Sequence, residues 1–138
     1  MIEKARKYCN LNKLRFTEPR EKVLNTLVDG KLPLGAYELL EKMSTKANKI
    51  NPPTIYRAID FWIEHGFIHK IVSLNKYIAC NHVHDARQAT KTTILICNKC
   101  SYIEEICLVL SIDSLFEEKG FDAQQVLIEA KGLCLNCK

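Results

Sequence analysis

NPPTIYRAIDFWIEHG, residues 51–66, is the stretch of sequence that decides the fold. Two prolines follow Asn51, where a helix can begin, and Gly66 stands where that helix can end. At 100° per residue, the apolar side chains gather on one side of the helix, at Ile55, Ala58, Ile59, Trp62 and Ile63. We therefore predict an amphipathic helix that packs on a core through that side.

The rest of this helix carries side chains that a helix facing only solvent rarely exposes together: Thr54, Tyr56, Arg57 and Phe61. A recognition helix exposes such residues because its N-terminal turns reach base edges in the major groove of DNA. Arg57 can bond guanine, Tyr56 can contact a thymine methyl group or a phosphate, and Thr54 lies where helix amides favour phosphate. The alternative is an ordinary surface, with Phe61 in a subunit contact.

Flanking patterns extend this helix into a winged helix-turn-helix, which is a bundle of helices followed by a β-hairpin. Apolar periodicity, Thr17 as a helix cap and turn residues predict helices over 2–14, 17–30 and 36–46, and hairpin strands over 67–72 and 77–80. Further strands are predicted over 93–97, 102–106 and 123–130, with a helix over 108–119. The fold class is therefore α+β, with a DNA-binding domain at 1–80, a hinge at 81–92 and a small α/β domain at 93–138.

Charge separates the two halves of this 138-residue chain. Residues 1–80 hold 14 lysines and arginines against 8 acids, whereas residues 81–138 hold 6 against 8. The basic N-terminal part is suited to binding a polyanion, and the predicted phosphate contacts are Arg15, Arg20, Lys70 and Lys76. The alternative is a basic face that is only solvated. The chain has no apolar run of membrane-spanning length and no secretory signal, so we expect a cytoplasmic protein without membrane contact.

Cysteine is unusually frequent, with seven residues, and two CxxC pairs stand out. Cys97 with Cys100, and Cys134 with Cys137, can each supply two corners of a tetrahedral zinc site, and together they close it. Such a site is structural and would stabilise a domain too small for a large core. A thioredoxin-like redox pair lacks its βαβ context here, and iron–sulfur ligation is the other alternative.

A second group of metal ligands lies around the predicted hinge. His69 and Cys80 belong to the hairpin, His82 and His84 follow it, and Glu104 with Glu105 lies on a strand of the back domain. Histidine, cysteine and a carboxylate are enough for a tetrahedral site. A metal bound there would fix the orientation of the two halves and so act as a switch.

These motifs together resemble the ferric uptake regulator superfamily, and most of all its zinc uptake regulator branch (Zur). The resemblance rests on PPTIYRAIDF at 52–61, EHGFIHK at 64–70, YIAC at 77–80, the CNKC and CLNC pairs, and EEIC at 104–107. It covers residues from about Arg15 to Cys137. The histidine that this branch carries seven residues before its first CxxC is replaced by Thr90, and the histidine cluster of iron and peroxide sensors is absent.

The resemblance implies a homodimeric, zinc-responsive repressor of zinc uptake genes that binds an AT-rich inverted repeat and holds two zinc ions per subunit. It implies a structural site of Cys97, Cys100, Cys134 and Cys137, and DNA reading by Tyr56 and Arg57. It also implies a regulatory site of His69, Cys80 and Glu105. His82 or His84 would be the fourth ligand, and His84 is preferred because it leaves more chain to fold back.

Three alternatives to this function remain at the level of sequence. A regulator of the same family could sense iron, manganese or nickel. A zinc hydrolase could hold a catalytic water at an open corner of the second site, but the chain has no separate nucleophile and no phosphate-cradling glycine loop, so we predict no enzyme and no small-molecule substrate. A zinc-dependent scaffold could use its helix-turn-helix for protein contact.

Overall fold

A computed structural model describes the chain except at residues 31, 46–48, 81–90, 108–112 and 124–125. The chain divides into two compact units, Met1–Cys80 and Asn81–Lys138. Most of the predicted hinge, at 81–90, lies outside the described residues. No helix in the described part of the chain is long and apolar enough to cross a membrane.

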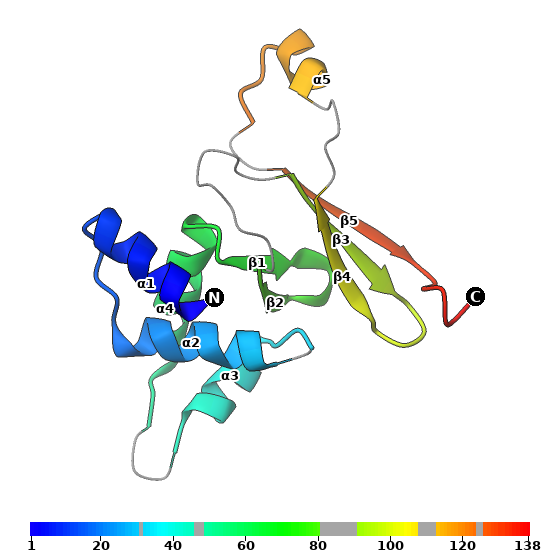
Figure 1. The fold of residues 1–138 in the computed structure, drawn as a ribbon. Helices are drawn as coiled ribbons and strands as arrows, with labels where there is room; N and C mark the ends of the chain where they lie inside the picture. The colour runs from blue at the N-terminus through cyan, green and yellow to red at the C-terminus, as the bar shows by residue number, and fades with distance from the viewer. Residues whose placement is uncertain (31, 46–48, 81–90, 108–112, 124–125) are drawn as a thin grey trace. The chain divides into compact units, whose positions relative to one another are not determined.

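The first unit is a set of helices followed by a two-stranded hairpin, which confirms the predicted winged helix-turn-helix (Figure 1). Its elements are α1 (Ile2–Leu11), α2 (Glu18–Asp29), α3 (Ala36–Met43), α4 (Pro52–Glu64), β1 (Ile68–Ile71) and β2 (Lys76–Ala79). A short 3-10 turn, Val72–Leu74, joins the two strands, which pair antiparallel. Gly66 has a φ of +75° after α4, a left-handed conformation that glycine adopts without steric cost.

The core of this unit is built on the apolar side of α4. Ile55, Ala58, Ile59 and Trp62 are all buried, as the helical periodicity predicts. The indole of Trp62 packs edge-on against Phe16 and Phe67, and its Nε1 donates a hydrogen bond of 2.8 Å to the backbone carbonyl of Arg20. This bond ties the start of α2 to α4 inside the core.

Three local predictions differ from the structure. The first helix ends at Leu11, before Lys13 takes a left-handed φ of 56°, and α3 ends at Met43. Phe61, predicted to face outward, is only 8% exposed. Its ring lies edge-on to Trp62 and under the guanidinium of Arg20, so neighbouring side chains cover a position that a helical wheel assigns to the surface.

An ion pair links the hairpin to α3. Glu38 accepts a hydrogen bond from the backbone N–H of Gly35, and it forms an ion pair of 3.1 Å with Lys76. The Gly35 N–H and then Lys76 lower the pKa of the Glu38 carboxyl. Lys76 thus pairs with Glu38 of α3, while its role as a phosphate contact stays a prediction.

The second unit is a three-stranded sheet with a short helix, which agrees with the predicted α+β class. It contains β3 (Lys91–Cys97), β4 (Ile103–Cys107), α5 (Asp113–Glu118) and β5 (Val126–Gly132). Strand β3 lies in the middle, antiparallel to β4 and parallel to β5 (Figure 1). Because β3 and β5 run the same way, the residues that follow them meet at one edge of the sheet.

Replacing Trp62 with phenylalanine tests the tie between α2 and α4. We expect Trp62→Phe to lower the free energy of unfolding by ~1–3 kcal/mol, because the partly buried carbonyl of Arg20 loses its donor. Urea unfolding followed by far-ultraviolet circular dichroism measures this, since Trp62 is the only tryptophan and fluorescence would be lost. Tyr37→Phe, at a side chain that is 74% exposed, is the control. Equal stability of the two variants would contradict the prediction.

Candidate metal centre and nucleic-acid interface

The four cysteines of the CxxC pairs converge because of the parallel strand pairing. Strands β3 and β5 are in register up to Cys97 opposite Gly132, and one CxxC turn follows each strand. The N–H of Asn98 donates to the carbonyl of Gly132 at 2.8 Å, which joins the two turns. Sequence spacing predicts two chelating pairs, and the sheet brings them to one place.

The geometry of this cluster fits zinc. The four sulfur atoms lie within 4.8 Å of one another, and those of Cys100 and Cys134 are 3.6 Å apart. Zinc–sulfur bonds of ~2.3 Å in a tetrahedron place sulfurs about 3.8 Å apart, so little movement is needed to enclose an ion. Cys97, Cys100, Cys134 and Cys137 would hold zinc with four thiolates, a set that leaves no corner for water and serves a structural role.

The pKa values of the thiols also fit a metal site. The backbone N–H groups of Cys100 and Cys134 lower the pKa of the Cys97 thiol to about 6. Hydrogen bonding to the sulfurs of Cys100 and Cys134 raises the pKa of Cys137 to about 12. Thiols packed this closely resist losing all of their protons, because each thiolate repels the next. A divalent cation removes that repulsion, so the donor set is suited to a metal.

The predicted DNA-reading residues lie together on the first turns of α4 and the start of α2. Tyr56 and Arg57 are exposed and Thr54 is half-buried, while Arg20 is half-buried and Arg15 exposed. No carboxylate pairs with Arg57 or Arg20 among the residues that the structure describes. Their charges are therefore available to an anionic partner.

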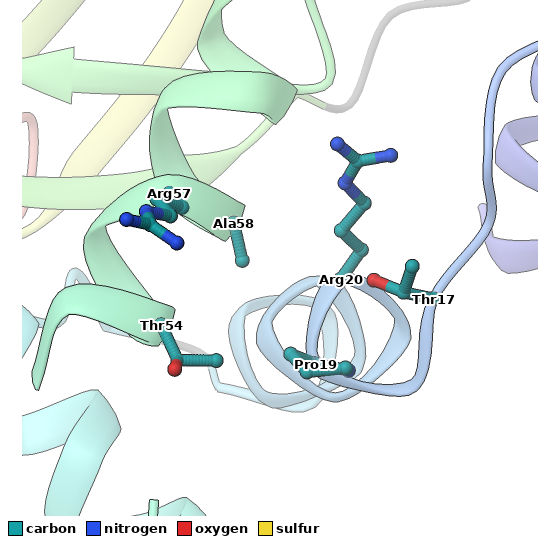
Figure 2. Close-up of a pocket in the computed structure, with 6 residues that line it drawn as sticks. All are labelled: Thr17, Pro19, Arg20, Thr54, Arg57 and Ala58. Atoms are coloured by element: carbon teal, nitrogen blue, oxygen red, sulfur yellow. The ribbon is translucent and has the colours of Figure 1, made fainter. Parts of the chain in front are cut away.

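A cavity of about 210 Å³ separates these two helix starts. Figure 2 shows Thr54, Arg57 and Ala58 on its α4 side, with Thr17, Pro19 and Arg20 at the start of α2 on the other. Arg20 also donates to the backbone carbonyl of Arg15. Both sides of this opening thus carry a guanidinium.

His69 and Cys80 lie close together on the hairpin of the first unit. Strand pairing places Ile68 opposite Ala79, and the N–H of Cys80 donates to the carbonyl of Phe67. Because side chains alternate between faces, His69 and Cys80 share the face that is turned away from the core. Both side chains are buried, and their ligand atoms lie within 4.8 Å of each other.

The other predicted regulatory ligands belong to the second part of the chain. Glu105 lies on β4 opposite Ile94, on the buried face of the sheet, whereas Glu104 is exposed on the other face. Of the two neighbouring acids, Glu105 is thus the half-buried one. His82 and His84 lie outside the described residues.

Sequence reasoning missed two contacts near α4. The guanidinium of Arg20 stacks on the ring of Phe61, and the hydroxyl of Tyr8 on α1 lies 3.2 Å from Nδ1 of His65 at the end of α4. Burial lowers the pKa of this histidine. Neither contact has a sequence signature, since each joins residues on different helices.

Comparison with known proteins agrees with this geometry. The model of the ferric uptake regulator family matches residues 11–130. The zinc uptake regulation protein of Escherichia coli (strain K12) is 37% identical over 143 residues, covering 99% of this chain and 81% of that protein. The protein of the same name from Shigella flexneri is equally similar.

Solved structures give the same result. A zinc uptake regulator complexed with zinc and DNA has a TM-score of 0.87 and 33% identity, covering 98% of this chain and 91% of that one. Holo XcZur has a TM-score of 0.85 and 33% identity, with coverage of 98% and 94%. Both similarities extend over nearly the whole of the chain.

Replacing one cysteine of the cluster tests the structural site. We expect Cys100→Ser to lose about one zinc ion per chain and to unfold the second unit at a lower temperature, because three thiolates hold the metal less well than four. Elemental analysis and circular dichroism melting measure the two effects. Cys9→Ser, the same exchange at a buried cysteine outside the cluster, should keep the full zinc content. A cluster variant with unchanged zinc would overturn the assignment.

Proposed function

The chain belongs to the ferric uptake regulator family, and we propose that it is a zinc-responsive, DNA-binding repressor of zinc uptake genes. One observation carries the proposal. The similarity to zinc uptake regulators, including one complexed with zinc and DNA, spans both the helix-turn-helix and the cysteine cluster. The family is one of transcriptional regulators, which agrees with a protein that is not an enzyme.

DNA reading falls to α4 in this proposal. Tyr56 and Arg57 are exposed on its second turn, while the opposite side of the helix is fixed in the core. An arginine there can bond guanine with two parallel hydrogen bonds, and Tyr56 can contact a thymine methyl group. Thr54, Arg15 and Arg20 contact phosphates and set the register of the helix in the major groove.

The operator follows from the symmetry of the protein. A homodimer, assembled through the second unit, presents two α4 helices related by a twofold axis. Such a dimer reads an inverted repeat with half-sites one or more helical turns apart, at ~34 Å per turn. We propose an AT-rich operator on the strength of the family resemblance, and the cytoplasm as the compartment because the target DNA lies there.

Zinc control requires a second ion beside the structural one, giving two per subunit. We assign it to His69 and Cys80 of the hairpin, Glu105 of β4 and His84. The proximity of His69 to Cys80 and the partial burial of Glu105 support this assignment. The cysteine among the ligands favours zinc over manganese, which prefers oxygen donors. A metal held by both units binds only one arrangement of them, and it thereby shifts the population toward that arrangement.

Arg57→Ala tests base reading by α4. With an operator selected from a random pool by the wild-type protein, we expect binding to weaken by ~1–3 kcal/mol and discrimination against a changed guanine to fall. Fluorescence anisotropy at saturating zinc measures both quantities. Lys119→Ala removes the same charge from an exposed position of the second unit and should bind nearly as well as wild type. If both variants lose the same affinity, Arg57 contributes only net charge.

Cys80→Ser tests the switch. The zinc content should fall from two ions to one, and operator affinity should no longer rise with free zinc, because the regulatory ion has lost its thiolate. Metal analysis and operator titration in zinc-buffered solution measure these effects. Glu105→Gln should reproduce the loss of response, whereas Cys9→Ser should preserve it. A Cys80→Ser protein that still responds to zinc refutes the site.

A further inference from the structure

The ring of Phe61 carries a contact that no part of the proposed function uses. The guanidinium carbon of Arg20 lies 3.4 Å from the centroid of this ring, so the planar cation is stacked on its face. We propose that Phe61 is a positioning residue for DNA binding: it holds the Arg20 guanidinium in place, across the cavity from Arg57, to contact a backbone phosphate. This inference rests on the proposed function, because it assigns a role within the same interface.

Phe61 can do this because its ring is itself fixed. The side chain is 8% exposed, and its ring makes edge contacts with Trp62 at 4.9 Å and with His65 at 4.4 Å between centroids. A phenyl ring held on two sides offers a face in one orientation only. That face is taken by Arg20.

Arg20 is held both at its backbone and at the end of its side chain. Its backbone carbonyl accepts the hydrogen bond from Nε1 of Trp62, and its guanidinium donates to the carbonyl of Arg15. Both groups that hold the arginine belong to α4 or to the turn before α2, and neither is a carboxylate. The stack therefore fixes the position of the cation without neutralising its charge.

The position of this cation suits a phosphate rather than a base. Arg20 lines the cavity of about 210 Å³ whose other side carries Thr54 and Arg57 from the first turns of α4 (Figure 2). An opening of this size is large enough to admit water and a phosphate oxygen. When the start of a recognition helix enters the major groove, the DNA strand that borders the groove passes this region. Phosphate contacts there fix the register of the helix on the DNA.

Fixing the arginine in advance has a measurable consequence. A long side chain that becomes ordered only on binding loses rotamer freedom at that step, and the affinity falls accordingly. If the stack orders Arg20 during folding, that loss does not occur when DNA binds. Removing the ring should therefore weaken DNA binding by about 2- to 10-fold without touching the charge or the base-reading residues.

The test is a double-mutant cycle on operator affinity, measured with the full-length protein at saturating zinc across a series of salt concentrations. Phe61→Leu should weaken binding ~2- to 10-fold and keep the preference among operator variants. Arg20→Ala should weaken binding more and reduce the salt slope by about 1, as expected for one lost phosphate contact. The double variant should bind no worse than Arg20→Ala alone, because Phe61 acts only through Arg20.

Two further variants separate positioning from folding. Phe61→Tyr keeps a ring face and should restore most of the affinity, while Arg20→Lys keeps the charge without a planar group and should bind like Phe61→Leu. Adding Phe61→Leu to Arg20→Lys should then change nothing. Independent, multiplying effects of the two sites would overturn the inference, as would full affinity of Phe61→Leu. Zinc-dependent binding by the wild-type protein remains the separate measure of the proposed function.

Discussion

Four thiols whose sulfur atoms lie within 4.8 Å of one another resist losing all of their protons unless a cation lies among them. The second unit depends on this constraint, because its protein core is thin. Among its described residues, those that are nearly fully buried all lie on β3: Thr92, Thr93, Ile94, Ile96 and Cys97. A single central strand buries little apolar area, so a zinc ion joining the ends of β3 and β5 would supply stability that packing does not.

The first unit is built in the opposite way, around a continuous apolar core on α4. The same helix carries Tyr56 and Arg57 on its exposed side, so the residues that would read DNA are positioned by the burial of Ile55, Ile59 and Trp62. Trp62 also bonds the carbonyl of Arg20, which extends this positioning to α2. The rigid core would thus contribute to binding, because it fixes the positions of the exposed side chains.

Sequence predicted what depends on local spacing and missed what depends on contact between elements. The period of α4, the hairpin and the two CxxC pairs are local patterns, and the structure confirms them. The burial of Phe61 could not be read from a helical wheel, because Arg20 and His65 cover it. Likewise, the ion pair between Lys76 and Glu38 joins two separate elements and has no signature in the sequence.

The hairpin shows why a switch needs ligands from more than one unit. Its core face carries Ile68, Tyr77 and Ala79, which leaves His69 and Cys80 on the opposite face, on a strand pair already fixed by the core. Zinc held by those two residues alone would bind every arrangement of the units equally and so would shift none of them. Moving a population from 1:99 to 99:1 requires about 10⁴-fold tighter binding to one arrangement, and only ligands outside the hairpin can supply that difference. The carboxylate of Glu105, on a different unit, is therefore a ligand that would turn a binding site into a regulatory one.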